Sequence, residues 1–497
     1  MELCKEYKSL NFCTEKDIMC EGFELEYQEN LPQYLDDIEK IVKCCVKNNV
    51  VDYECSNSMI KLYGKSIISI TYMNCDGTLL SNIFEEDFTK SFDIDINDNI
   101  KFAKINLNTK YYNVRLINQR RIDIHTSLKA NITVFFEKAD KCLDKCENAF
   151  IKEYSPSCLV QKNSGICSEE FDEVFSISNT GTQIKNIINS NACIYIDDKK
   201  IIKDKMLVKA RIEISVLFEN DNNIIDKCTY SFGINKIIDV ASCQENDKVF
   251  VSADISSMYV KTKTDSNNNL CNIELVGKAT FNYSIYAMCE EKYVTDSYMP
   301  DFDSQLSLSS INIKANPIYY FDDRTIECTV DCENDIVEIL DLSVNILDTV
   351  VEGSNLIITA QLRYLYYDDK SNLSFFEKTF SEKIAICDEC MHGVANANII
   401  SFDYVIKNAG SVALRMNLEY QAYLFKNETV EYVTDIIASN QKNETNKPQL
   451  TLYFAKKNEN VWDIAKQFST DVTLIMDENE LTSQILDCQR VLLVPGM

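Results

Sequence analysis

The stretch Val216-Leu-Phe-Glu-Asn-Asp-Asn-Asn-Ile-Ile-Asp-Lys-Cys-Thr-Tyr-Ser-Phe232 decides the fold of this chain, because the chain repeats it. It aligns without gaps with Tyr364-Leu-Tyr-Tyr-Asp-Asp-Lys-Ser-Asn-Leu-Ser-Phe-Phe-Glu-Lys-Thr-Phe380. A third, slightly longer copy starts at Ile70-Thr-Tyr-Met-Asn-Cys-Asp-Gly-Thr-Leu-Leu80 and ends at Phe88. Each copy predicts a strand, a polar turn rich in Asn and Asp, a second strand and an anchoring Phe.

The segments around these copies alternate between apolar and polar side chains. A period of two predicts strands with one buried and one solvated face, and such strands build antiparallel sheets. Apolar residues lead into the copies at Ile68, Ile70 and Tyr72, at Ile212, Ile214, Val216 and Phe218, and at Leu356, Ile358, Ala360, Leu362 and Tyr364. Longer alternating segments follow at Ile122, Ile124, Leu128, Ala130, Ile132 and Val134, at Ile273, Leu275, Ala279, Phe281, Tyr283 and Ile285, and at Val412, Leu414, Met416, Leu418, Tyr420 and Leu424.

We therefore expect a mainly β chain with three β-sandwich-like repeats in tandem, although a barrel stays open for each repeat. A small α+β module of βααβ order is expected to follow them. The expected domains span residues 1–150, 181–296, 330–440 and 449–497. Less regular stretches at 138–180 and 296–330 are expected between the repeats. A polar linker at 439–448 is expected to act as a hinge before the terminal module.

Local signals predict the elements of this terminal module. Asn460 and Asp471 are candidate helix caps, because their side chains accept hydrogen bonds from the free backbone amides of a first helical turn. Apolar residues follow the caps at helical spacing, at Val461, Ile464, Ala465 and Phe468 and then at Val472, Ile475 and Met476. Strands are expected at 450–455 and 490–494, where they would pair beside the two helices.

The terminal segment resembles a LysM module through Val461-Trp-Asp-Ile-Ala465, Asn479-Glu-Leu481 and the closing Gln489-Arg-Val-Leu-Leu-Val-Pro495. The phrases Cys20-Glu-Gly-Phe-Glu-Leu25 and Leu31-Pro-Gln-Tyr-Leu-Asp-Asp-Ile38 resemble the opening of another family, although a second Pro and a Lys of that pattern are missing here. With the three repeats, these features make the whole chain similar to the SPOCS-domain proteins of spore-forming Firmicutes. The three repeats would then be SPOCS repeats.

The resemblance implies a non-enzymatic structural protein of spore coat assembly. Such proteins act in the mother-cell cytoplasm, gather at the forespore surface and help the coat to encase the spore. In that family the LysM region makes much of the contact with the coat morphogenetic ATPase SpoIVA, and other coat proteins are further partners. The repeats would form an elongated scaffold, and several weak modules on one chain would together bind with high avidity.

Six residues of the terminal module are candidate partner contacts: Asn458, Glu459, Asn460, Trp462, Asn479 and Leu481. LysM modules that bind peptidoglycan or chitin have Gly-Asp-Thr in place of the first three, and Gly permits backbone conformations that Asn enters less easily. We therefore expect a protein ligand, with peptidoglycan as the alternative. Trp462, the single Trp of the chain, is either an interface anchor or a residue packed on the module's own core.

Composition argues against several classes of partner. A formal net charge of −27 disfavours nucleic acid and anionic membranes, because phosphate neutralisation needs clustered Lys and Arg. The sequence shows no signal peptide and no apolar run of transmembrane length, which predicts synthesis in the cytoplasm without membrane insertion. Its 21 cysteines are then expected to be reduced. The alternative is oxidative cross-linking in an outer layer, as in a self-assembling exosporium or appendage subunit.

Catalytic signals are missing from the sequence. It has two histidines and no nucleophile elbow, phosphate-binding loop or dinucleotide fingerprint, so we expect no enzyme activity and no cofactor. Cys387, Cys390 and His392 are a weak zinc candidate, because zinc needs four ligands and a Cys-x2-Cys pair supplies two. Cys328 and Cys332 could complete such a site. Loop thiols without a metal are the preferred interpretation.

Overall fold

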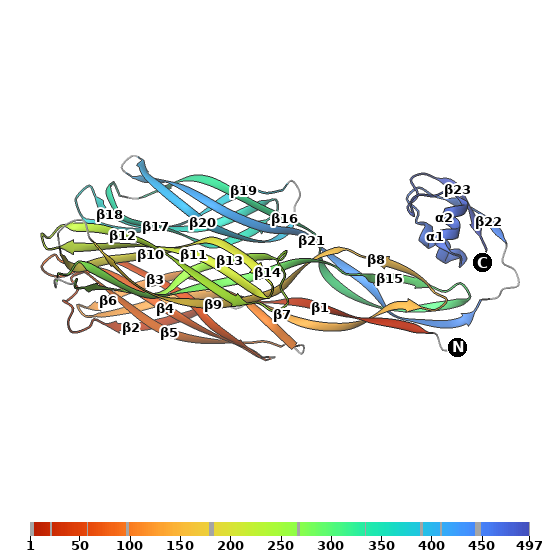
Figure 1. Ribbon diagram of the computed structural model, residues 1–497, viewed down its shortest axis with the longest axis horizontal. Coiled ribbons are helices and arrows are strands. Elements are labelled where there is room, and N and C mark those ends of the chain that lie inside the picture. Colours follow the sequence, from red (N-terminus) through yellow and green to blue (C-terminus); the bar gives the residue numbers. More distant parts are fainter. Residues whose placement is uncertain are drawn as a thin grey trace.

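The computed structural model describes residues 4–19, 22–56, 58–95, 99–177, 183–265, 269–332, 334–387, 391–407, 410–442 and 449–496. These residues form 23 strands and two short helices, so the predicted mainly β class is confirmed. Figure 1 shows an elongated molecule in which long strands bundle at one end, a narrower stalk continues from them, and the C-terminal segment forms a small module of its own. Within the described residues, neither helix has the length and apolar character that a membrane crossing requires.

Three units of the bundle share one strand plan. Each unit combines a three-stranded antiparallel meander with a second sheet, in which the last strand pairs with the unit's first and penultimate strands. Unit 1 contains β1 (Lys5–Met19), β2 (Phe23–Asn30), β3 (Lys40–Cys55), β4 (Met59–Met73), β5 (Leu79–Asp93), β6 (Asn99–Asn118) and β7 (Arg121–Cys146). Unit 2 contains β9 (Ser157–Ser176), β10 (Ile184–Ile202), β11 (Lys205–Asn220), β12 (Ile225–Asp239), β13 (Lys248–Lys263) and β14 (Asn272–Glu290). Unit 3 contains β16 (Phe302–Asp331), β17 (Ile336–Glu352), β18 (Asn355–Asp368), β19 (Leu373–Ala385), β20 (His392–Lys407) and β21 (Ser411–Gln441).

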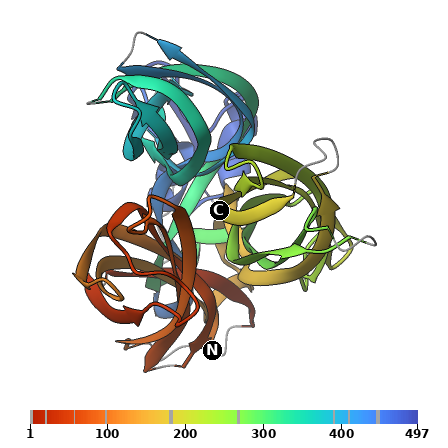
Figure 2. The same ribbon diagram turned by 90° about the vertical axis from the view of Figure 1, so that its left-hand side faces the viewer.

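The alternating segments of the sequence form the cores of these units. The predicted apolar residues of β7 between Ile122 and Val134 are at most 2 % exposed. Those of β14 belong to the buried cluster of unit 2, and those of β21 from Val412 to Tyr420 belong to the cluster of unit 3, while Leu424 is also buried. Figure 2 shows the three units arranged around a common centre, so each unit has an inner side that faces the other two.

The stretches predicted to be less regular are strands, so that expectation is wrong. β9 lies within 138–180 and opens unit 2, while β16 covers most of 296–330 and opens unit 3. Many side chains of these two strands stay partly exposed, and their sequences therefore lack the apolar alternation that marks the other strands. Of the expected linker, residues 439–441 continue β21, and 443–448 lie outside the described residues.

The turn inside the repeated phrase is the same in all three units. The Asn or Asp that starts it accepts hydrogen bonds from the backbone amides two and four residues later, at 2.7 to 3.0 Å. These turn-starting residues are Asn74, Asn220 and Asp368. The residue three positions further has a positive φ in each unit, at Gly77, Asn223 and Ser371. The short polar side chains of the phrase thus fix each hairpin locally.

The stalk consists of three antiparallel ribbons that extend beyond the units. One pairs β1 with the end of β7, one pairs β8 (Phe150–Tyr154) with β15 (Tyr293–Tyr298), and one pairs the first part of β16 with the end of β21. Their apolar side chains share one core, which contains Leu10, Cys142, Leu143, Cys146, Tyr293, Val294, Ile313, Val430, Tyr432 and Val433. Figure 1 shows these ribbons running toward the terminal module.

A buried polar chain joins the three units at their common centre. Lys43, Asn189 and Asp341 lie opposite Thr71, Leu217 and Leu365, which hold the same place in the three copies of the repeated phrase. Lys43 Nζ donates to Asn189 Oδ1 at 2.7 Å, and Asn189 Nδ2 donates to Asp341 Oδ2 at 3.1 Å. We call these three residues the junction triad. One cation, one amide and one anion at equivalent positions make the units complementary to one another.

Candidate functional site

The terminal module has the elements that its sequence predicts. They are β22 (Leu450–Ala455), α1 (Val461–Phe468), α2 (Val472–Glu478) and β23 (Arg490–Pro495). Asn460 caps α1 by accepting from the Trp462 amide at 2.9 Å, and Asp471 caps α2 by accepting from the Thr473 amide at 2.8 Å. The two strands pair antiparallel and pack with the helices around a core that contains Ala455, Val461, Ile464, Ala465, Ile475, Leu492 and Val494.

The turn before α1 holds three of the predicted contact residues. Asn458 adopts a left-handed conformation with a φ of 68°, and its amide donates to the Leu486 carbonyl. Asn458 therefore adopts the backbone conformation that Gly enters more easily than Asn. The turn itself thus does not disfavour a glycan ligand. Glu459 accepts from the Tyr453 hydroxyl at 2.6 Å, and this hydrogen bond lowers the pKa of the Glu459 carboxyl.

Trp462 faces the protein's own stalk. Its side chain is 5 % exposed, and its Nε1 donates to Asp296 Oδ2 of β15 at 2.8 Å. Its ring meets the Tyr298 ring edge to face at a centroid distance of 5.0 Å, and the Tyr298 hydroxyl donates to the Thr470 carbonyl at 2.6 Å. Lys466 adds an ion pair to Asp296 at 2.6 Å. The α1 side of the module is therefore docked on the stalk.

Asn479 and Leu481 hold the module together from inside. The Asn479 side chain accepts from the Leu493 amide and donates to the Leu493 carbonyl, both at 2.7 Å, and so ties the end of α2 to β23. Leu481 is half-buried against the module core. Both candidate contact residues therefore stabilise the module itself in this conformation.

The outer side of the β22–β23 ribbon is an apolar face that the sequence analysis missed. It consists of Leu450, Leu452, Phe454, Val491, Leu493 and Pro495, which are paired across the two strands. Leu452 is 63 % exposed and Phe454 is 72 % exposed. The signal for this face in the sequence was an apolar side chain on both sides of the strand 450–455. The helix side holds Tyr453 and Ala455, and the other side is equally apolar. We call these six residues the apolar face.

Cations lie at one end of the β22–β23 ribbon. Lys456 directly follows β22, and Arg490 starts β23 opposite Ala455. Lys457 is the next residue of the chain after Lys456. In a chain of net charge −27, this end of the ribbon suits a partner with carboxylates beside its apolar side chains.

The docked state gives a first prediction. Replacing Asp296 with Ala removes the charged acceptor of Trp462 and Lys466, so we expect docking to weaken by about 1.5–3 kcal/mol. Hydrogen–deuterium exchange of the full chain should become faster in β15 and α1 and remain unchanged in unit 2. Asp477→Ala, which removes an exposed carboxylate from α2, is the matched control. Unchanged exchange in β15 would show that Asp296 does not hold the module.

The candidate zinc residues are only partly within the described chain. Cys387 follows β19 and His392 starts β20, whereas Cys390 lies outside the described residues. No group of three His, Cys, Asp or Glu side chains in the described part is arranged to hold a metal ion.

Other cysteines of the chain are buried thiols. Burial raises the pKa of the Cys158 and Cys193 thiols to about 11, so these two groups stay protonated at neutral pH.

Residues 183–263 match the family model described as SipL, SPOCS domain. The matched segment runs from the start of β10 to the end of β13 and thus includes the meander of unit 2. No curated protein and no solved structure matches the chain. Over this segment, unit 2 is therefore similar to the SPOCS domain.

Proposed function

We propose that this protein is a non-enzymatic scaffold and adaptor of spore coat assembly. In this proposal units 1 and 3 are SPOCS repeats like unit 2, and the terminal module is a LysM domain. The three repeats form the body, and the terminal module binds the coat morphogenetic ATPase of the SpoIVA type. The protein acts in the mother-cell cytoplasm, at the forespore surface and in the coat. The SPOCS match to unit 2 supports the link to sporulation.

The single observation that carries the docking proposal is the apolar face. Its four most exposed side chains are Leu450, Leu452, Phe454 and Val491, each about half exposed or more. Contiguous apolar surface of about a few hundred Å² on a soluble protein marks an interaction site. Trp462 is turned to the stalk, whereas the apolar face remains open to a partner.

The chemistry of this face favours a protein over a glycan. Aliphatic and aromatic carbons offer no hydrogen bonds to sugar hydroxyls, whereas they bury well against apolar side chains at about 25 cal/mol per Å². The cations at Lys456, Lys457 and Arg490 would pair with carboxylates at the edge of the partner's contact surface. The expected ligand is thus an apolar surface of the ATPase with acidic residues next to it.

Charges placed on the apolar face provide the test. In the full chain, Leu452→Asp and Phe454→Asp should each weaken capture of the coat ATPase from sporulating cells by about tenfold or more, because each buries a charge in the contact. Leu474→Asp is the matched control, since Leu474 is 43 % exposed on α2, away from this face. Binding is measured with purified ATPase, and circular dichroism checks that each variant is folded.

The outcome also separates the alternatives. Sedimentation with purified peptidoglycan that survives Leu452→Asp but is lost on removing residues 449–497 would favour the glycan hypothesis. Equal ATPase binding by Leu452→Asp, Phe454→Asp and the unmodified chain would refute the apolar face as the docking surface. A deletion strain with normal coats would refute the proposed role itself.

A further inference from the structure

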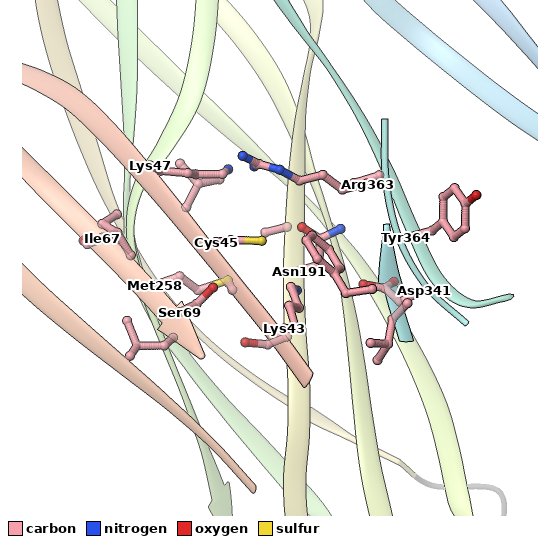
Figure 3. Close-up of a pocket in the computed structure, with 18 residues that line it drawn as sticks. Lys43, Cys45, Lys47, Ile67, Ser69, Asn191, Met258, Asp341, Arg363 and Tyr364 are labelled. Carbon is pink, nitrogen blue, oxygen red and sulfur yellow. The ribbon is translucent and has the colours of Figure 1, made fainter. Parts of the chain in front are cut away.

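A cavity of about 80 Å³ lies where the three units meet. Side chains from all three units line it, and Figure 3 shows them as sticks. They include Lys43, Cys45 and Lys47 of β3, Asn191 of β10, Asp341 of β17 and Arg363 of β18. One water needs roughly 10–15 Å³ of such volume, so the cavity has room for about five to eight atoms of that size.

The lining of this cavity holds more cations than carboxylates. The three cations are Lys43, Lys47 and Arg363, and the single carboxylate is Asp341. Asp341 is already engaged, because it accepts from Asn189 and forms an ion pair with Lys227 at 3.4 Å from outside the cavity. A chain with far more acidic than basic residues thus gathers cations at its centre.

Two of the cations have weak compensation. Lys43 Nζ contacts the Asn189 amide oxygen and lies 5.6 Å from the centre of the Phe375 ring, and neither group carries a negative charge. Lys47 reaches Asp254 at 3.5 Å, but the carboxylate side chain is half exposed and solvent screens this pair. The ammonium groups therefore retain much of their capacity to attract an anion.

Arg363 completes the arrangement. Its Nε donates to Glu377 Oε2 at 2.6 Å within unit 3, and the same carboxylate accepts from the Tyr112 hydroxyl of unit 1 at 3.1 Å. Figure 3 shows the side chains of Arg363 and Lys47 pointing toward one another above Cys45. Two cations that approach across a partly buried space repel each other, and an anion between them removes this cost.

We propose that this cavity binds a small tetrahedral oxyanion, with inorganic phosphate as the ligand that fits best. Phosphate has five non-hydrogen atoms, which matches the available room, and its oxygens accept hydrogen bonds from ammonium and guanidinium groups. Hydroxyls of Ser69, Ser190 and Ser343 and the amide of Asn191 supply neutral donors around the same space. The bound anion joins units 1 and 3 directly and secures unit 2 through Asn191.

The test is phosphate binding by the purified full chain, measured by equilibrium dialysis with radiolabelled phosphate at constant ionic strength. We expect one phosphate per chain, displaced by sulfate. Lys47→Gln should weaken binding by about tenfold or more, because it removes a charged donor. Lys236→Gln is the matched control, since Lys236 is equally exposed at 26 % and pairs with Glu169 far from the cavity.

A second measurement keeps the test independent of folding defects. Phosphate should raise the melting temperature of the unmodified chain and of Lys236→Gln relative to chloride, and it should have little effect on Lys47→Gln. No bound phosphate at millimolar concentration, or equal binding by Lys47→Gln, would overturn the assignment. The phosphate cavity lies between the three units and does not involve the terminal module. Failure of the phosphate test and failure of the ATPase-binding test can therefore be distinguished.

Discussion

Replacing Asp341 with Ala is expected to lower the free energy of unfolding by about 2–3 kcal/mol, because it removes a buried charged acceptor from Asn189 and the counter-charge from Lys227, whose side chain is 39 % exposed. The side chain of Asp341 is 6 % exposed and accepts from both Asn189 and Lys227. Its loss leaves the buried Asn189 amide without its acceptor and leaves the Lys227 ammonium without its counter-charge. The junction between units 2 and 3 should therefore loosen first.

Urea unfolding of the purified chain measures this effect, and hydrogen exchange locates it. Asp239→Ala is the control, because Asp239 is 89 % exposed and lies 3.9 Å from Lys205 in the same unit as Asn189. Leu at all three positions of the junction triad should recover much of the lost stability, since replacing both partners with apolar groups can be nearly neutral. A loss below about 1 kcal/mol for Asp341→Ala would mean that the triad does not hold the units together.

Local features of the fold could be predicted because they depend on neighbours in sequence. Alternation located the core strands, and the turn residue Asn220 with its equivalents fixed each hairpin through contacts two and four residues away. The helix caps Asn460 and Asp471 follow the same logic. Hydrophobic periodicity and helix capping depend on residues a few positions apart, so they can be recognised in a single sequence.

Contacts between distant segments could not be predicted in this way. Trp462 meets Asp296 across 166 positions of the chain, and a sequence offers no sign of which carboxylate will face an indole. The junction triad depends on three residues that are equivalent only once the strand registers are known. Both sides of β22 carry apolar residues, and the sequence pattern alone does not tell which side the helices of the module cover.

Glycines inside strands also make contacts with distant residues that the sequence alone does not predict. Among the residues that the structure describes, three glycines lie directly opposite an aromatic residue, in the pairs Gly64–Phe88, Gly277–Phe171 and Gly165–Tyr283. In each pair the aromatic side chain occupies the space where a Cβ would stand. The anchoring Phe88 explains why the third copy of the repeated phrase is longer: its turn has the common length, and the Phe sits two residues further along, over Gly64.

Gly277→Val is the second change with a large expected effect, a loss of about 3 kcal/mol in the free energy of unfolding. A Cβ at Gly277 would lie 2.6 Å from the Ser257 carbonyl oxygen and 2.5 Å from Phe171 Cζ. The ring could turn aside, but Ser257 O belongs to the backbone of β13 at a bulge, so the strands themselves must separate. The cost is therefore overpacking in the sheet that carries the core of unit 2.

Gly233→Val isolates the steric cause. Gly233 also lies in a strand of unit 2, β12, but the nearest atom to its Cβ position is 4.0 Å away. A β-branched residue there should be neutral or slightly stabilising, because Gly is unfavourable in strand interiors and Val suits them. Urea unfolding followed by tyrosine fluorescence compares the two variants. Similar losses for both would attribute the effect to the backbone preference of Gly rather than to the Phe171 ring and the bulge beside it.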